Sequence, residues 1–277
     1  MSVFRSADGR VRSGWVIAVF TAIAVGVSFV MFIGIEFAGF SEPDRLEPKL
    51  FFSTTISMIG GIAATVACWL LFREETALDT RPALPLVIGF GLGALAITLS
   101  VVLPALVGAQ TLEFNREWSP LTALIEFTAL APAGVGEELL LRGLGLQALR
   151  RGIGDKAAVI GSSILFGVLH LTNPHASWEA AAIITLVGFW FGAAMVRTGK
   201  IWVPMGLHIG WNFFEGSVFG QPVSGLSPGV PLFTAWWPAE RGFWSGANFG
   251  PEAAGWTVVV LLFATALTLA IPRRTER

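Results

Sequence analysis

Long apolar stretches alternate with short polar stretches along the whole chain. Eight apolar stretches reach or approach the length of about 20 residues that a helix needs to cross a bilayer. Their approximate limits are residues 14–40, 50–72, 83–109, 120–149, 156–173, 178–197, 201–219 and 255–272. These stretches are continuously apolar rather than alternating, and lipid offers no hydrogen-bond partner to the backbone, so each is predicted to be helical. We therefore expect an all-α fold, a polytopic membrane bundle of about eight transmembrane helices.

The composition agrees with this pattern. Of the 277 residues, 54% are hydrophobic and only 13% are charged, with a mean hydropathy of +0.69. These values exclude an ordinary soluble domain, and a formal net charge of −1 gives no reason to expect a nucleic-acid partner. We predict a single membrane domain over residues 1–277. The single cysteine, Cys68, excludes an internal disulfide and is interpreted as a small core residue.

The basic residues predict the orientation of the bundle. Of the 18 Lys and Arg residues, most fall on one predicted side of the membrane. Only Arg45, Lys49, Arg116 and Arg241 fall on the other side, and Arg142 lies inside the fourth stretch. Because basic loops stay in the cytoplasm, both termini are predicted to be cytoplasmic, in a multi-pass protein of the cell membrane.

Two further patterns concern packing and the outer side. Gly188 and Gly192 have the small-xxx-small spacing of a helix-packing face. The predicted outer segment, about residues 220–254, is rich in aromatic residues, which we interpret as a belt at the membrane interface. These residues are Trp236, Trp237, Phe243, Trp244 and Phe249.

Three charged residues, Glu137, Glu138 and Arg142, lie inside the fourth apolar stretch. Each charge at mid-membrane costs about 2.5–3.5 kcal/mol, so the three must be paired or hydrated. Glu138 and Arg142 stand four residues apart and share a helix face, which predicts an ion pair. Glu137 points about 100° away from Glu138 and is left for another role. The alternative is that all three only tie helices together.

The chain has three histidines. His170 and His208 lie in apolar helices, Asn212 follows His208 by one turn, and His175 is expected to be a solvated loop residue. Glu137 beside an imidazole could act as general base to a water, with His208 and Asn212 donating hydrogen bonds to an oxyanion. Glu137 and the two imidazoles could instead hold a divalent metal such as zinc. Spacing does not separate these two hypotheses.

Two more carboxylates stand on the same helical stripes as these residues. Glu126 precedes Glu137 by eleven residues, and Glu215 follows His208 by seven. Both could line a hydrated cavity or relay protons, or could pair with ordinary partners near helix ends.

Three short motifs occur in the core region 120–219. They are EELLLR from Glu137 to Arg142, FGVLH from Phe166 to His170, and HIGWN from His208 to Asn212. As EExxxR, FxxxH and HxxxN in this order, they resemble the CAAX protease and bacteriocin-processing (CPBP, or Abi) family of intramembrane endopeptidases. The resemblance covers about 95 residues; the first three helices and the last share only hydropathy with the family.

The resemblance implies a role for each motif residue. Glu137 and His170 would activate water, His208 and Asn212 would form the oxyanion side, and Glu138 with Arg142 would support them. Family members are classed as metalloproteases, for which Glu137, His170 and His208 would be the ligands, although a metal-free glutamate mechanism has also been argued for the fold.

The resemblance also implies the partners. We expect membrane lipid and a peptide or lipidated-protein substrate, cleaved near the membrane. The composition, rich in Ala, Gly and Arg and without Tyr, is typical of a prokaryotic protein. Alternatives are a non-catalytic membrane scaffold or bacteriocin-immunity factor with the same fold, and a transporter. A transporter would favour inverted repeats, and the sequence shows no internal repeat.

The predicted helices do not place the motif residues at one depth. Counting about 1.5 Å per residue from the cytoplasmic ends puts Glu137 about 18 Å, His170 about 21 Å and His208 about 10 Å deep. A common site therefore requires tilted or broken helices. Pro132 and Pro204 are the expected kink positions.

Overall fold

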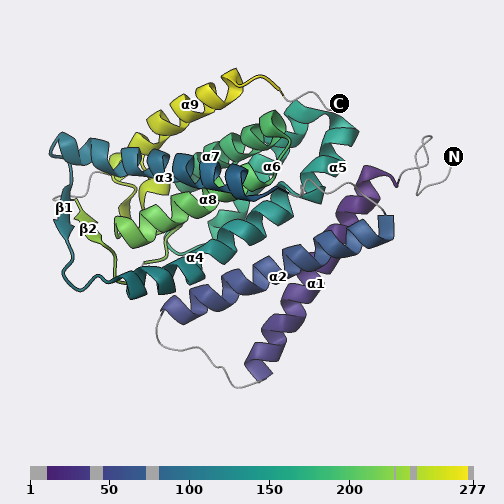
Figure 1. Ribbon diagram of the computed structural model, residues 1–277, viewed down its shortest axis with the longest axis horizontal. Coiled ribbons are helices and arrows are strands. Elements are labelled where there is room, and N and C mark those ends of the chain that lie inside the picture. Colours follow the sequence, from purple (N-terminus) through teal and green to yellow (C-terminus); the bar gives the residue numbers. More distant parts are fainter. Residues whose placement is uncertain (1–10, 38–45, 73–80, 228, 238–241, 274–277) are drawn as a thin grey trace.

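The computed structural model describes residues 11–37, 46–72, 81–227, 229–237 and 242–273. These residues form nine α-helices and one two-stranded sheet (Figure 1). The helices are α1 (Ser13–Phe37), α2 (Leu46–Phe72), α3 (Ala83–Leu106), α4 (Pro120–Leu141), α5 (Leu144–Ile153), α6 (Asp155–Leu169), α7 (Trp178–Thr198), α8 (Trp202–Phe213) and α9 (Gly255–Ala270). The strands are β1 (Thr111–Phe114) and β2 (Phe233–Trp236). The helical fold of a membrane protein agrees with the hydropathy pattern.

Shorter helical turns complete the chain. A π-helical turn, η2 (Phe214–Val218), follows α8 directly. The 3₁₀ turns are η1 (His170–Thr172), η3 (Gly242–Trp244), η4 (Ala247–Phe249) and η5 (Pro251–Ala253). The three last of these lie in the segment between β2 and α9.

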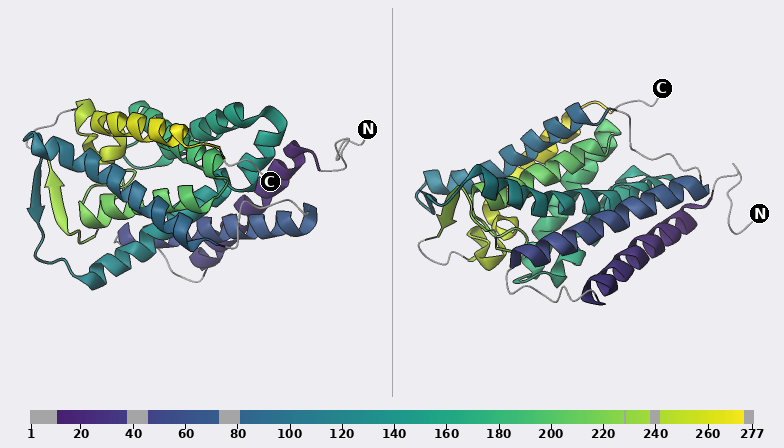
Figure 2. Two further views of the ribbon diagram at one scale, coloured as in Figure 1. Left: turned by 45° about the horizontal axis from the view of Figure 1, so that its top comes forward. Right: turned by 60° about the horizontal axis from the view of Figure 1, so that its bottom comes forward.

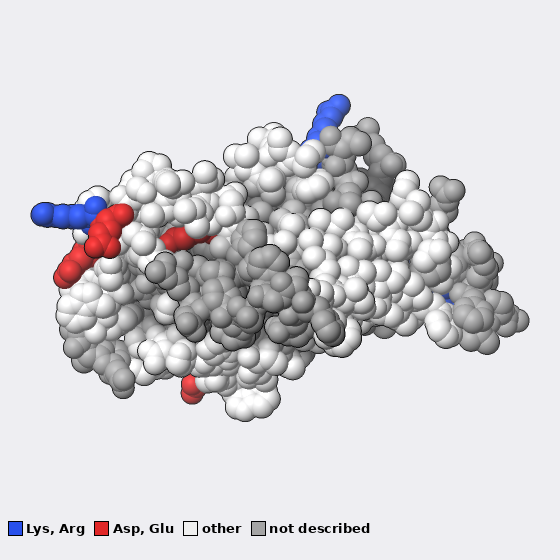
Figure 3. All heavy atoms as spheres, turned by 90° about the horizontal axis from the view of Figure 1, so that it is seen from below, with Lys and Arg blue, Asp and Glu red and all other residues white. Residues whose placement is uncertain are grey.

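Three described helices are long and apolar enough to cross a membrane, over Ser13–Met31 of α1, the whole of α3 and the whole of α7. Shorter apolar helices cover Met58–Leu71 and α9. The described part of the face in Figure 3 carries few charged side chains. Eight spans and the cytoplasmic position of the termini stay predictions.

The predicted single helix over residues 120–149 is wrong. The chain turns at Arg142 and Gly143, so that α4 ends at Leu141 and α5 begins at Leu144. Apolar composition alone gave no sign of this break. Its physical cause is local: the Arg142 side chain is drawn back onto α4 by Glu138, and a Cβ at Gly143 would lie 2.3 Å from the carbonyl oxygen of Leu139.

Contacts between helix ends define the two ends of the molecule. Arg273, just after α9, pairs with Asp155 at the start of α6 at 3.0 Å, and Arg197 near the end of α7 donates to the carbonyl of Ile271. Ser13 at the start of α1 lies beside Gly152 of α5. The start of α1 and the end of α9 therefore lie at the same end (Figure 1).

The sheet marks the opposite end of the molecule. Strands β1 and β2 pair antiparallel, with Thr111 opposite Trp236 and Phe114 opposite Phe233. This sheet ties the connection between α3 and α4 to the long segment between α8 and α9. Figure 2 shows both strands beyond one end of the bundle, far from α5.

Helices α3 and α8 touch through their backbones at four glycines, Gly89 and Gly93 on α3 and Gly206 and Gly210 on α8. A Cβ at any of the four would lie within 2.2 Å of a carbonyl oxygen of the other helix. Only glycine permits so close an approach. This contact fixes α8 on both sides of His208.

The packing face predicted from Gly188 and Gly192 is confirmed. A Cβ at Gly188 would lie 3.0 Å from Arg142 and from Phe166, and one at Gly192 would lie 2.9 Å from Val159. Helix α7 therefore packs closely against α6 and over the end of α4. It also carries much of the main core, including Trp190 and Phe191.

Two smaller predictions concern single residues. Cys68 is fully buried among α1, α2 and α5, as expected of a core residue. Phe249, in contrast, is only 2% exposed and belongs to the main core, so its assignment to an interfacial belt is wrong. Of the other four aromatic residues, Trp236, Phe243 and Trp244 are about half exposed.

Candidate active site

The two adjacent glutamates lie in the last turn of α4. This helix begins with a reciprocal cap between Ser119 and Thr122 and runs without a break through Pro132. The Glu138 side chain is fully buried, whereas that of Glu137 is 31% exposed. The 100° between successive helical residues thus places one carboxylate inside the bundle and leaves the other partly exposed.

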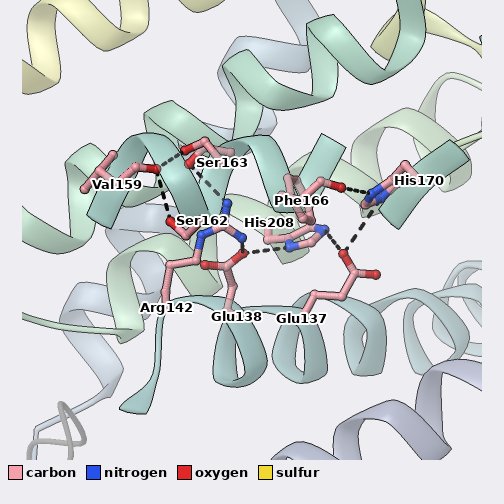
Figure 4. A network of polar contacts seen from close by, with 10 residues as sticks. Glu137, Glu138, Arg142, Val159, Ser162, Ser163, Phe166, His170 and His208 are labelled. Carbon is pink, nitrogen blue, oxygen red and sulfur yellow. Dashed lines mark hydrogen bonds and ion pairs between the residues drawn. The ribbon is translucent and has the colours of Figure 1, made fainter. Parts of the chain in front are cut away.

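Glu138 and Arg142 form the ion pair expected from their spacing, at 2.8 Å between Oε1 and Nη1 (Figure 4). The same Oε1 also lies 3.2 Å from Nδ1 of His208 on α8. Nη2 of Arg142 donates to the carbonyl of Gly188 on α7 at 3.1 Å. A single buried network therefore joins α4, α7 and α8, and sequence reasoning missed its link to His208.

Aromatic rings cover the buried guanidinium. Its Cζ lies 4.5 Å from the centre of the Phe166 ring and 5.7 Å from that of Phe191. The negative face of an aromatic ring attracts a cation, and this attraction is stronger where water is excluded. Arg142 is thus held by a carboxylate, a carbonyl and two rings.

Hydrogen bonds fix the tautomers of both histidines. Nδ1 of His170 lies 2.8 Å from the carbonyl of Phe166, one turn earlier, and Nδ1 of His208 faces the Glu138 carboxylate. A carbonyl or an ionised carboxylate only accepts hydrogen bonds, so both Nδ1 atoms carry protons. In the neutral rings both Nε2 atoms are then bare acceptors.

Both Nε2 atoms point at the same oxygen. Oε2 of Glu137 lies 3.8 Å from Nε2 of His170 and 4.0 Å from Nε2 of His208 (Figure 4). These distances are too long for direct hydrogen bonds, and Oε2 has no hydrogen-bond partner among the described residues. Three acceptors that face one point require a donor or a cation between them, and one water can reach two of them at about 2.8 Å each.

Asn212 lies near the site, whereas His175 lies outside it. Asn212 is buried one turn after His208, and its Oδ1 has no hydrogen-bond partner within the described ranges. His175 is exposed in a turn with a φ of 58° and lies outside the site. Because neutral His208 carries its proton on Nδ1, its Nε2 can donate to an oxyanion only after gaining a second proton.

The prolines expected to kink the helices do not interrupt them. Pro204 lies in the first turn of α8, and α4 continues through Pro132, so neither proline breaks its helix. The chain breaks instead at Gly143, between α4 and α5, and α8 continues into the π-helical turn after Phe213. Glu137 and His170 both lie at helix ends, where their side chains reach His208.

The side chains of Glu137, His170 and His208 are not arranged as metal ligands in this structure. In the described part of the chain, no group of three or more His, Cys, Asp or Glu side chains is arranged to hold a metal ion. Neighbouring ligands in a tetrahedral zinc site are about 3.3 Å apart, given bonds of about 2.0 Å, and the distances from Glu137 are longer. A divalent metal on Glu137, His170 and His208 stays a prediction.

The two further carboxylates belong elsewhere. Glu126 accepts a hydrogen bond from the backbone N–H of Val230, which anchors the segment after α8 to α4. Glu215 is fully buried in η2, and neither of its carboxyl oxygens has a hydrogen-bond partner among the described residues. Both glutamates lie toward the end of the molecule that carries the sheet.

Sequence signals existed for some of the missed contacts. The four-residue spacing of Phe166 and His170 allows the bond from an imidazole to the carbonyl one turn earlier. Gly206 and Gly210 flank His208 with small-xxx-small spacing, which predicts close packing of α8. The contact between Glu138 and His208 joins residues 70 positions apart and had no local signal.

Comparison with known families agrees with this site. Residues 118–214 match the family model described as Type II CAAX prenyl endopeptidase Rce1-like. The matched segment runs from just before α4 to the start of η2 and contains all the motif residues. No curated protein gives a match. Over these residues the chain is similar to the CAAX protease family.

Proposed function

We propose that this protein is an intramembrane endopeptidase that hydrolyses a peptide bond near the membrane with a water activated by Glu137. The observation that supports this function best is the convergence of the Nε2 atoms of His170 and His208 on Oε2 of Glu137. The match of residues 118–214 to the CAAX prenyl endopeptidase family model supports a CAAX-protease type of enzyme. A multi-pass position in the cell membrane is part of the proposal.

Water activation follows from the chemistry of this point. A water hydrogen-bonded to Glu137 and His170 gives a proton to the Glu137 carboxylate as its oxygen attacks the peptide carbonyl carbon. The carbonyl oxygen then carries the negative charge. Glu137 returns the proton to the departing amine when the C–N bond breaks, so the reaction consumes one water and releases an acid and an amine.

The oxyanion needs hydrogen-bond donors on the opposite side. The amide of Asn212 offers N–H groups, and His208 offers a second donor once Nε2 is protonated. Glu138 bonded at Nδ1 orients the His208 ring, as the third group of a triad orients its base. Arg142 pairs with Glu138 and holds its carboxylate in place. This arrangement gives both residues of the ion pair a supporting role.

The proposed substrate is a peptide or lipidated protein with its cleavage site at the membrane. Apolar residues on α6 next to His170 are about half exposed: Ile164, Leu165, Val168 and Leu169. Such a surface can pack against lipid chains, either of the bilayer or of a lipid-modified substrate. A prenylated substrate is the first to test because the matched family is described as a prenyl endopeptidase.

The test uses purified full-length protein in lipid vesicles and an internally quenched, farnesylated peptide ending in a Cys-aliphatic-aliphatic-X sequence. Glu137→Gln should lower cleavage about 100- to 10,000-fold because the base is lost, with unchanged folding because Oε2 holds no hydrogen bond in the described structure. Glu113→Gln on β1 is the control. Cleavage by Glu137→Gln at the wild-type rate would refute the proposal.

Two further arms separate the alternatives. The unmodified peptide tests whether the lipid is required for cleavage. A chelator tests whether a metal is required. Cleavage that persists in the chelator supports the metal-free reaction, and cleavage that is lost in the chelator and restored by zinc supports the metalloenzyme. A wild-type protein that folds and cleaves neither peptide would favour a scaffold.

A further inference from the structure

We propose that the side chain of Phe166 is a positioning element for the active site: its ring fixes Arg142 and both imidazoles so that His170 and His208 face Glu137. This inference rests on the proposed function and adds a residue to it. Phe166 touches no reacting atom and acts through its neighbours.

The ring of Phe166 contacts all three groups at once. Cζ of Arg142 lies 4.5 Å from its centre. The ring centre lies 4.6 Å from that of His170, at 74°, and 5.9 Å from that of His208, at 84°. Such nearly perpendicular arrangements match the charge distribution of aromatic rings, in which the face is negative and the edge is positive.

The backbone and the side chain of Phe166 act separately. The carbonyl accepts the Nδ1 proton of His170 whatever side chain the residue carries. That single bond leaves the imidazole able to rock about it, and the perpendicular ring blocks this motion. Replacement of Phe166 by a non-aromatic residue therefore removes the ring contacts and keeps the hydrogen bond. The contribution of the ring can in this way be measured apart from that of the backbone carbonyl.

The ring is itself tightly held. Phe166 is 2% exposed, and a Cβ at Gly188 would lie 3.0 Å from its Cδ1 and 3.0 Å from Nη2 of Arg142. Phe191 lies beyond it, with ring centres 6.5 Å apart. A methyl group at Gly188 would therefore press on both the Phe166 ring and Arg142. This provides a second way to disturb the contact between them.

Activity measurements on the full-length protein with the farnesylated peptide give the first test. Phe166→Leu should lower kcat about 10- to 100-fold, as expected for misplaced catalytic groups, with KM changed less than about threefold. Phe166→Tyr keeps the ring and should retain kcat within about threefold. Phe249→Leu makes the same change at another buried core phenylalanine and should leave kcat unchanged.

A spectroscopic test does not depend on activity. In a His175→Gln background only His170 and His208 remain, so ¹⁵N-histidine NMR reports on the two site imidazoles alone. Wild-type rings should both show a protonated Nδ1 and a bare Nε2. Phe166→Leu should shift or broaden both sets of signals, whereas Phe249→Leu should leave them in place.

Opposite results would overturn the inference. If Phe166→Leu matches Phe249→Leu in both kcat and imidazole spectrum, the ring only fills space. If Phe166→Leu does not fold, Gly188→Ala gives the same test, with Gly161→Ala as control because that position has open space. Full activity of Glu137→Gln would refute the proposed function, while the spectra would still decide the role of Phe166.

Discussion

The chain buries carboxyl groups in two regions, and it stabilises them in different ways. Where α4 crosses α8, Glu138 is bound by Arg142 and His208. Toward the sheet, Glu126 accepts from a backbone N–H and Glu252 accepts from the hydroxyl of Ser224. Glu215 has no hydrogen-bond partner for either carboxyl oxygen within the described ranges. We call these the inner and the outer acidic regions.

The difference separates a charged site from an anchoring site. In the inner region the partners of Glu138 are ionisable groups, Arg142 at the end of α4 and His208 on α8, and His208 also faces Glu137, the proposed base. In the outer region Glu126 and Glu252 accept hydrogen bonds from neutral donors in the segment between α8 and α9. The kind of partner, charged or neutral, therefore distinguishes the two regions.

The largest expected effect comes from leaving an inner charge without its partner. Arg142→Met should lower the free energy of unfolding by about 3–5 kcal/mol because Glu138 stays buried without its cation. Denaturation of the detergent-solubilised protein measures this loss. The double variant Arg142→Met/Glu138→Gln should recover part of it. A single variant as stable as wild type would show that the ion pair contributes nothing.

In the outer region a smaller loss is expected on removing an anchor. Glu126→Ala should cost about 1 kcal/mol because the N–H of Val230 loses its acceptor. Hydrogen exchange at Val230 should become faster in this variant. Glu126→Gln keeps an acceptor oxygen and should behave like wild type; equally fast exchange in both variants would mean that the bond does not form.

The same isosteric change in both regions sharpens the comparison. Glu215→Gln should change stability by less than about 1 kcal/mol, or raise it, because it removes a buried carboxyl that has no hydrogen-bond partner among the described residues. Glu138→Gln should be far more harmful because it strands Arg142. Equal losses from the two changes, measured in one unfolding assay, would contradict the distinction between the regions.

The smallest effect on stability is expected at Asp155, the partly exposed first residue of α6. A hydrogen bond from Arg150, assisted by the charge of Arg273, holds the pKa of Asp155 below its ordinary value. Its stabilisation is therefore complete above the unfolded pKa of about 3.9 and is lost as the pH falls through the lower folded value. Arg150→Gln should flatten this dependence, by less than about 1 kcal/mol because the groups are partly exposed.

Helical rules predicted the inner region well at short range. The i, i+4 spacing of Glu138 and Arg142 gave their ion pair, and the different direction of Glu137 gave its separate position. The meeting of Glu137, His170 and His208 was expected from the motifs. Their catalytic roles stay predictions that the variants above address.

Contacts between distant segments could not be read from the sequence. The link from Glu138 to His208 and the cover of Phe166 over Arg142 depend on how α4, α6 and α8 pack. The break at Gly143 was hidden in a continuous apolar stretch. Phe249 was assigned to the interface because it stands in an aromatic-rich outer segment, and nothing in the sequence indicated that its ring turns into the core. Hydropathy measures affinity for lipid and says little about which neighbour a residue meets.

The four-glycine contact between α3 and α8 extends the inner region beyond the matched family segment. His208 is carried by a helix whose backbone rests directly on α3, and α3 lies outside residues 118–214. Any added side-chain volume along that contact would lift the imidazole away from its acid. A transplant of the matched segment into another protein would therefore have to bring α3 with it to keep its working alignment.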